Sequence, residues 1–354
     1  MCLKQRIKLL CLTILILLLC INVGCNHGAS FKSPNFNERT KRFEHPDGVA
    51  QEKSFSSIVS FALEYFTRER DIEENTGFPV IYRTKEQLDS FKENVMWIGH
   101  STLLLNHSNL TVLTDPHLSE RASPLTFLGP KRVTPQPLDV ADLPPVDVVV
   151  ISHNHYDHLD AVTIKSLIQL QPNVKFLVPL GLKHLVEKWG AIAVQELDWW
   201  EKTKVKGVVI QPTPVQHWSK RTAFDRNKTL WSGWMLQWPD FSFFFAGDSG
   251  YSNDFKTVAE KLGAPTLAAI PIGAYEPRHF MKVAHLNPRE AVQVFQDLNA
   301  KYAIGIHWGT FKLTLEPMQE PQKKLTEELK GVSLIEREFR TLKHGETWPK
   351  IFLR

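Results

Sequence analysis

The stretch Ser152-His153-Asn154-His155-Tyr156-Asp157-His158 decides the fold, and it directly follows the apolar run 146–151. That run is short, rich in valine and ended by polar residues, which is typical of a buried strand in an α/β sheet. Imidazole nitrogens and carboxylate oxygens are the ligands that Zn²⁺ accepts when no thiolate is available. The spacing therefore predicts a metal-binding loop at the end of a strand.

The order of residues in this loop predicts two metal positions rather than one. His153 and His155, two residues apart in an extended turn, can converge on one ion. Asp157 and His158 can turn to a second ion. Two ions held in this way polarise one substrate oxygen and one water together.

Three further histidine or aspartate residues stand at the ends of predicted strands: His217, Asp248 and His307. Open α/β sheets place their sites at the carboxyl ends of strands, so we expect these side chains to join the loop. Any one of them alone would more often be structural, but their joint placement favours a site. Asp115 repeats the pattern, either as a carboxylate that orients a ligand imidazole or as an ordinary turn residue.

Cysteine usage excludes several kinds of site from most of the chain. The 354 residues contain 4 cysteines, all within the first 25 residues: Cys2, Cys11, Cys20 and Cys25. Residues 26–354 contain no thiol, which excludes an internal disulfide, a thiolate metal site and a cysteine nucleophile there. Cleavage before Cys25 would leave Cys25, the first residue, as the one thiol of the remaining chain. Any metal must then be held by histidine, aspartate or glutamate.

Residues 1–25 resemble an export signal. Lys4, Arg6 and Lys8 precede the apolar run 9–23, which is shorter than the ~20 residues of a spanning helix. Gly24-Cys25 resembles a bacterial lipoprotein cleavage site, which predicts export across the cytoplasmic membrane and a lipid anchor at Cys25. An uncleaved anchor and plain secretion remain alternatives. Without the three basic residues the net charge of +4 falls to about +1, which gives no case for nucleic acid.

The sequence predicts three parts: a signal or anchor (1–25), a linker and N-terminal extension (26–93), and a folded domain (94–354). Helical apolar spacing predicts an amphipathic helix over 55–66. Short apolar runs predict strands at 110–114, 146–152, 175–178, 205–213, 241–246, 267–271 and 302–306. Helical patterns lie at 161–169, 182–189, 253–262 and 288–299. We therefore expect a layered α/β domain.

Several loop segments from about residue 94 to the end resemble N-acylphosphatidylethanolamine-hydrolysing phospholipase D, within the metallo-β-lactamase superfamily. The most specific are Gly99-His100-Ser101-Thr102, Leu128-Gly129-Pro130-Lys131-Arg132, Glu196-Leu197-Asp198-Trp199-Trp200 and Ile306-His307-Trp308-Gly309-Thr310. The resemblance implies a four-layer αβ/βα sandwich with two zinc ions per chain. It also implies a homodimer.

The resemblance assigns a role to each candidate residue. It puts His153, His155 and His217 on one zinc, puts Asp157, His158 and His307 on the other, and lets Asp248 bridge both. Tyr156 and His285 match positions for substrate phosphate and catalysis, although Tyr156 could instead pack beside the metals. Asp157, Asp248 and His285 are thus the predicted catalytic residues.

The implied reaction hydrolyses N-acylphosphatidylethanolamine in membranes to N-acylethanolamine and phosphatidic acid. A hydroxide bridging the two zinc ions would attack phosphorus, and Asp248, His285 or a water would supply the leaving group's proton. An anionic membrane surface could be contacted by Lys220, Arg221 and several tryptophans. Alternatively, Lys220 and Arg221 could be a solvated pair, and the tryptophans could be core residues. The alternatives are a sugar-phosphate lactonase or other phosphodiesterase of the same fold, or a non-catalytic lipid-binding lipoprotein.

Overall fold

The computed structural model describes residues 30–47, 55–67 and 77–352. The predicted signal or anchor, with Cys25, lies outside the described residues. Within them, no helix has the length and apolar character needed to cross a bilayer. The amphipathic helix predicted over 55–66 is confirmed as α2 (Phe55–Thr67).

Two mixed sheets form the centre of the molecule. The first has the strand order β3-β4-β5-β6-β7-β8, with bounds Asn94–Gly99, Thr102–His107, Leu110–Thr114, Val148–Val150, Lys175–Pro179 and Val194–Leu197. The second has the order β15-β14-β13-β12-β11-β10-β9, with bounds Glu338–Arg340, Tyr302–Ile306, Leu267–Pro271, Ser242–Phe245, Gly233–Gln237, Val208–Thr213 and Thr203–Val205. Strands β5 to β8 are parallel, as are β12 to β15.

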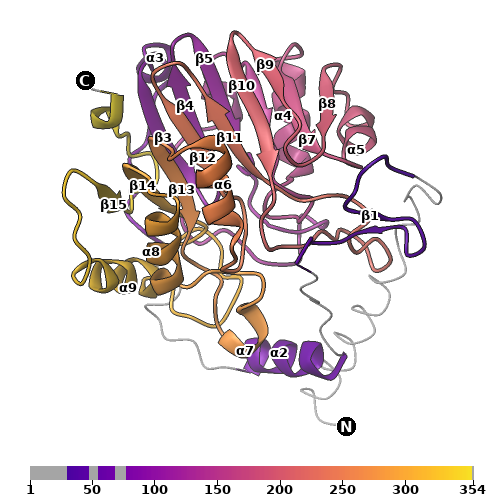
Figure 1. Ribbon diagram of the computed structural model, residues 1–354. Coiled ribbons are helices and arrows are strands. Elements are labelled where there is room, and N and C mark those ends of the chain that lie inside the picture. Colours follow the sequence, from indigo (N-terminus) through magenta and orange to yellow (C-terminus); the bar gives the residue numbers. More distant parts are fainter. Residues whose placement is uncertain (1–29, 48–54, 68–76, 353–354) are drawn as a thin grey trace.

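The two sheets face each other and helices cover their outer faces (Figure 1). Val149 of β6 and Ile151, directly after it, pack with Ile164 of α4 (Ala161–Leu170), whereas Val148 and Val150 join a cluster that includes the second sheet. This alternation is expected of a strand buried on both faces. Helix α5 (Lys183–Lys188) lies on the same side as α4, and α6 (Asp254–Leu262), α8 (Pro288–Asp297) and α9 (Glu320–Leu329) lie on the other. The predicted four-layer αβ/βα sandwich is confirmed.

One predicted strand is in fact two. The run 205–213 contains a tight turn at Lys206 and Gly207, whose φ angles are 47° and 85°, and β9 and β10 pair across it. Several elements of the domain were not predicted from sequence patterns. They are the strands β3, β4, β8, β11 and β15, the helix Glu320–Leu329 (α9), and the short elements α3 (Lys85–Asp89), α7 (Arg278–Met281) and two 3₁₀ turns (Val140–Asp142 and Pro349–Phe352).

Residues 30–47, predicted as part of a linker, instead pack on the sandwich. They form a small hairpin of β1 (Phe36–Asn37) and β2 (Arg42–Phe43), whose aromatic rings join a cluster with Trp199 and Trp231. His45 is buried and its Nε2 lies 2.8 Å from Asp254 Oδ2 of α6. We call residues 30–47 the strap.

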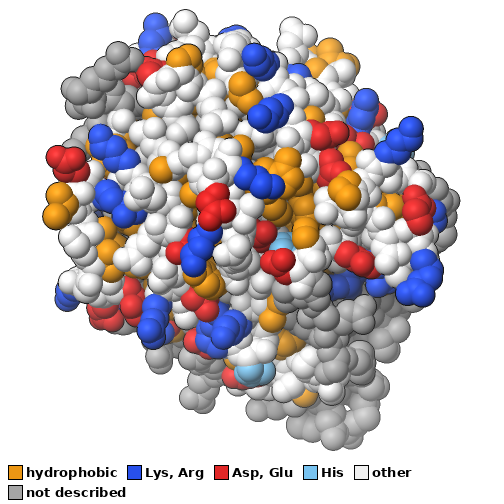
Figure 2. All heavy atoms as spheres, in the orientation of Figure 1, with side chains coloured by type: hydrophobic (Ala, Val, Ile, Leu, Met, Phe, Trp, Pro, Cys, Tyr) orange, Lys and Arg blue, Asp and Glu red, His pale blue; other side chains and the backbone are white. Residues whose placement is uncertain are grey.

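Most of the tryptophans considered for membrane contact are core residues. Trp199, Trp231, Trp234 and Trp238 are buried, and each indole N–H donates to a backbone carbonyl. On the face shown in Figure 2, lysine and arginine side chains are interspersed with aspartate and glutamate. This face therefore offers no continuous basic stripe to a phosphate backbone.

Candidate metal centre

The metal-binding loop predicted from sequence connects β6 to α4 and lies at the carboxyl end of β6, an interior strand of the first sheet. Asp160 caps α4, since its carboxylate accepts from the backbone N–H groups of Val162 and Thr163. The Arg221 guanidinium donates to the carbonyls of Asn154 (2.9 Å) and Leu159 (2.8 Å). Arg221 thus holds the loop near both of its ends, and Asp160 joins it to α4.

Three histidines form one group of converging donors, which we call the triple-histidine set: His153, His155 and His217. His155 Nδ1 lies 2.7 Å from His153 Nε2 and 3.3 Å from His217 Nε2. His153 and His217 are 1% exposed. All three rings therefore present a nitrogen atom to one common position.

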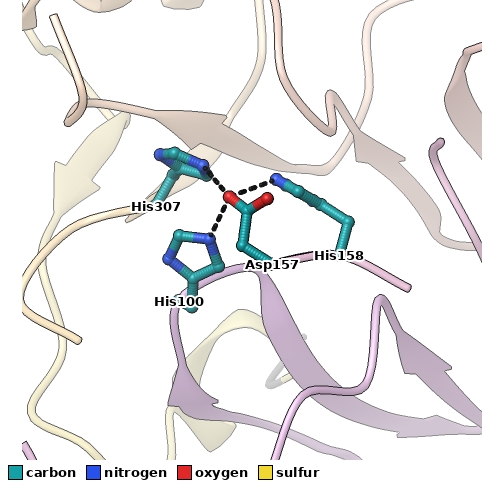
Figure 3. A group of neighbouring side chains, drawn as sticks. All are labelled: His100, Asp157, His158 and His307. Atoms are coloured by element: carbon teal, nitrogen blue, oxygen red, sulfur yellow. Dashed lines mark hydrogen bonds and ion pairs between the residues drawn. The ribbon is translucent and has the colours of Figure 1, made fainter. Parts of the chain in front are cut away.

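A second group, the mixed set, contains Asp157, His158 and His307. The Nε2 atoms of His158 and His307 lie 3.4 Å and 3.3 Å from Asp157 Oδ2. The same oxygen lies 3.1 Å from His100 Nε2, so three imidazoles surround one carboxylate (Figure 3).

Asp248 lies between the two sets. Its Oδ2 is 3.1 Å from His158 Nε2 and 3.8 Å from His217 Nε2, and its Oδ1 is 3.2 Å from His307 Nε2. The preceding Gly247 has φ 60°, and a Cβ there would meet Ser152 Cβ at 2.6 Å. Glycine is therefore needed for this strand end to approach the metal-binding loop.

Hydrogen bonds outside the two sets orient the imidazoles. Asp115 Oδ2 lies 2.7 Å from His158 Nδ1, and its Oδ1 accepts from the Ser152 N–H at 2.7 Å. The His217 Nδ1 lies 3.0 Å from the carbonyl of Ala284. In both cases Nε2 is left facing the site, as expected of metal-binding histidines. Of the two interpretations of Asp115, the structure favours the orienting carboxylate.

The two sets differ in electrostatics. Burial lowers the pKa of His153 and His155 well below the ordinary value and that of His217 to about 4. Burial also lowers the pKa of His307, but Asp248 and Asp157 outweigh it and raise that pKa to about 9.

The pKa values of the two carboxylates shift in the opposite direction to that of His307. Burial raises the pKa of Asp157 and of Asp248, yet the surrounding imidazoles, His158 foremost, outweigh it and hold both pKa values well below the ordinary one. The same two carboxylates raise the pKa of His158 against its burial. The mixed set therefore attracts positive charge.

The two donor sets are suited to binding metal ions. Among the described residues, every ion-pair contact to Asp157 or Asp248 comes from a histidine. Asp248 is buried and the Asp157 side chain is only 16% exposed, so two carboxylates without lysine or arginine partners call for a cation. Groups of these donors lie within 4.8 Å of one another: His153, His155 and His217 in one, and Asp157, His158, His307 and His100 in another.

The remaining predicted site residues lie around this centre. His285 Nδ1 lies 3.8 Å from Asp248 Oδ2, and its side chain is 12% exposed, so it borders the site from the solvent side. The Tyr156 hydroxyl donates to the carbonyl of Arg221 (3.0 Å), and its ring lies under that guanidinium at 4.0 Å. Arg221 is thus engaged with the loop, while Lys220 is half-buried.

Sequence reasoning missed the contact of His100 with Asp157. The stretch containing His100 is part of the resemblance, yet it carries no metal-ligand spacing and its partner is 57 residues away. A histidine directly after the apolar run 94–99 was the available signal.

Comparison with known proteins places this architecture in a family. The model of the beta-lactamase superfamily domain matches residues 111–308. The chain is 44% identical over 264 residues to N-acyl-phosphatidylethanolamine-hydrolyzing phospholipase D 1 of Caenorhabditis elegans, covering 71% of this chain and 74% of the relative. It is 38% identical to the mitochondrial N-acyl-phosphatidylethanolamine-hydrolyzing phospholipase D of Saccharomyces cerevisiae, where the match covers 65% of this chain and 50% of the relative.

Solved structures show the same fold at lower identity. The isothiocyanate hydrolase from Delia radicum gut bacteria superimposes with a TM-score of 0.58 at 19% identity, covering 72% of this chain and 98% of that one. A possible metal-dependent hydrolase from Veillonella parvula gives 0.57 at 19% identity with the same coverage. The chain belongs to the beta-lactamase superfamily and, within it, to the N-acylphosphatidylethanolamine-hydrolysing phospholipase D family of metal-dependent hydrolases.

Proposed function

We propose that the protein is a zinc-dependent phospholipase D that hydrolyses N-acylphosphatidylethanolamine to N-acylethanolamine and phosphatidic acid. The observation that carries the proposal is the pair of donor sets joined by Asp248, in a chain 44% identical to the nematode enzyme. Histidine and aspartate without cysteine suit Zn²⁺.

The proposal assigns the triple-histidine set to one zinc and the mixed set to the other, with Asp248 shared. Two zinc ions bound there would lower the pKa of a water and neutralise charge on the phosphodiester. Asp248 is buried and 3.1 Å from His158 Nε2, so it is held rigidly between the two positions. Asp115 and the Ala284 carbonyl keep the imidazoles oriented.

His285 is the side chain that we propose to meet the substrate. It is the partly exposed imidazole beside Asp248, and its ring centroid lies 5.3 Å from that of His217 and 5.6 Å from that of His307. A ring at this border can contact the phosphodiester and exchange a proton with the leaving alkoxide. The Arg278 guanidinium fixes its backbone by donating to the His285 carbonyl at 2.9 Å.

Two exposed phenylalanines support contact with a membrane surface. Phe127 is 74% exposed and Phe224 is 70% exposed. Phe224 lies in the loop that Arg221 ties to the metal-binding loop, and Phe127 lies in the loop closed by the Arg121–Lys131 bridge. Exposed aromatics of this size are typical of interfacial contacts. We propose that these loops contact the bilayer that contains the substrate.

Export and a lipid anchor at Cys25 remain proposals, supported by the sequence of residues 1–25. The intact mass of purified protein tests them, since a chain that begins at Met1 contradicts cleavage. A homodimer, implied by the family resemblance, would give in light scattering twice the mass of the single chain, which is 40.6 kDa before any cleavage.

The deciding experiment uses purified protein and vesicles containing N-acylphosphatidylethanolamine. We expect phosphatidic acid and N-acylethanolamine to form in the zinc-loaded sample and not after chelation. A matched variant, His285→Ala, should bind zinc normally and lose turnover. If the zinc-loaded protein leaves the lipid intact but hydrolyses a lactone or a cyclic nucleotide, the proposal is wrong and another hydrolase activity of the fold takes its place. If two zinc ions bind and nothing is hydrolysed, a lipid carrier is the better interpretation.

A further inference from the structure

We propose that His100 is a positioning residue, whose Nε2–H donates a hydrogen bond to Oδ2 of Asp157 and holds that carboxylate in place for the mixed set. The inference deepens the proposed function and rests on its assignment of a metal to this set. No role for His100 follows from the predicted ligand spacing. Figure 3 shows the His100 ring reaching the Asp157 oxygen from below, with the His307 ring above that oxygen and the His158 ring to its right.

The backbone of His100 is fixed on several sides. Its N–H donates to Thr310 Oγ1 at 2.7 Å, and its carbonyl accepts from Trp97 Nε1 and from the His307 N–H, both at 2.9 Å. Its φ angle of 51° is a conformation that side-chain-bearing residues seldom adopt. These hydrogen bonds fix the position from which the ring extends. One of them links the His100 backbone to the strand end that carries His307.

The turn that carries His100 depends on a glycine. Gly99 ends β3 with φ 144°, and a Cβ there would lie 2.8 Å from His344 Cδ2. The ring of His100 is 1% exposed and packs edge-on against Phe311 at 5.3 Å. Burial of an imidazole without a polar partner is costly, so the contact with Asp157 also accounts for a histidine at this position.

The chemistry of the carboxylate assigns the donor. Asp157 Oδ2 accepts and cannot donate when ionised, so an imidazole nitrogen at 3.1 Å must present N–H. His158 and His307 approach the same oxygen, but each needs a lone pair on Nε2 to bind a metal. Neither Nε2 can therefore donate a hydrogen bond to Asp157 in the metal-bound protein. His100 is the neighbour that can keep donating.

A competing role for His100 is that of a further metal ligand, because its donor atom lies within 4.8 Å of those of Asp157, His158 and His307. The two roles require opposite states of Nε2. A positioning residue carries a proton there, whereas a ligand carries a lone pair. The tautomer of His100 therefore decides between them.

The first experiment measures zinc affinity by chelator competition in full-length variants. His100→Leu removes the donor, and His100→Gln keeps an N–H at similar reach. We expect His100→Leu to weaken binding of one of the two zinc equivalents by about 10- to 100-fold, and Gln to restore most of the loss. His45→Leu is the matched control, since it removes another buried histidine–aspartate contact, 2.8 Å long and outside the site. It should leave both zinc affinities unchanged.

Unchanged affinity in a folded His100→Leu protein would contradict the proposal. So would a His100→Gln protein as impaired as the leucine variant, because the imidazole itself would then be required. The second experiment needs no folded variant at this position. Long-range ¹H–¹⁵N correlation of histidine-labelled, zinc-loaded wild-type protein should show His100 protonated at Nε2 and not at Nδ1. A zinc-bound Nε2, or a proton on Nδ1 instead, overturns the assignment.

These readouts separate the inference from the proposed function. Zinc affinity and the tautomer are measured without a lipid, so they stand even if the protein does not hydrolyse N-acylphosphatidylethanolamine. Conversely, turnover of the lipid by a protein whose His100→Leu variant binds zinc normally would support the function and reject the positioning role.

Discussion

The triple-histidine set and the mixed set lie next to each other and share Asp248, yet their environments differ in charge. The triple-histidine set contains no carboxylate of its own, and burial, together with repulsion from neighbouring imidazoles, lowers the pKa of each member. The mixed set is built around Asp157, and with Asp248 it raises the pKa of His307 to about 9. One set thus disfavours protons, whereas the other retains them until a metal replaces them.

The difference shows in which of the two sets protons compete with a metal. Protons compete with a metal for His158 and His307, because both pKa values are raised. Such competition is weak in the triple-histidine set at neutral pH. We therefore expect the two positions to respond differently to substitution and to pH.

Loss of the Asp157 carboxylate should have the largest effect. In Asp157→Asn the mixed set keeps its shape but loses its own negative charge, so its metal should be lost and turnover should fall by about a thousandfold or more. Metal analysis should then find one zinc equivalent, in the triple-histidine set. Near-normal turnover, or two retained equivalents, would contradict the site assignment.

Removal of His307 should be almost as severe. His307→Ala removes one of the two imidazoles that contact both Asp157 and Asp248, at 3.3 and 3.2 Å, and leaves only His158 between them. We expect turnover to fall nearly as far as in Asp157→Asn and one zinc equivalent to be lost. His279→Ala, which alters an exposed histidine of α7, is the control and should retain both. Equal activity of the two variants would remove the mixed set from the mechanism.

Asp115→Asn should have an intermediate effect. Asp115 fixes His158 through a 2.7 Å contact to Nδ1, so the amide can flip and favour the wrong tautomer. Such outer contacts are typically worth about 10- to 100-fold in metal affinity. Competition with a chelator measures the change, and Asp139→Asn, in an exposed turn, serves as the control. A variant with wild-type affinity would show that His158 needs no partner at Nδ1.

The smallest expected effect is a pH dependence of stability in the metal-free protein. The folded-state pKa of His307 is raised from 6.5 to about 9, so its stabilisation is fully present below pH 6.5 and is lost as the pH rises through about 9. The free energy of unfolding, measured with urea and a chelator, should fall across this window. The zinc-loaded protein should not show this fall, since its His307 carries no proton to lose. A flat metal-free profile would show that the two sets do not differ in charge as described.

Much of this site could be predicted because its residues follow recognisable strands. Asp248 and His307 come after apolar runs that the structure confirms as β12 and β14, and parallel strands bring their carboxyl ends to one edge. His100 could not be assigned, since a single histidine in a turn shows no spacing. Its partner becomes visible only when residues 57 positions apart meet.

The strap shows a second limit of sequence patterns. Residues 30–47 are polar on average, and three phenylalanines among them do not follow a helical or strand period. Phe36 and Phe43 nevertheless pack with each other at a ring-centroid distance of 5.0 Å and join the cluster around Trp231. Tertiary packing thus ordered a segment that composition had marked as a linker.

The placement of donors on both sheets has a consequence for folding. His155 follows a strand of the first sheet and His217 a strand of the second, 62 residues later, while Asp157 and His307 are 150 residues apart. A metal bound by such pairs joins the two halves of the sandwich as a reversible cross-link across long chain loops. It can form only after both sheets have docked, and it stabilises the folded state in proportion to the logarithm of free metal. The unfolding midpoint of the protein is therefore also a measure of the metal available to it.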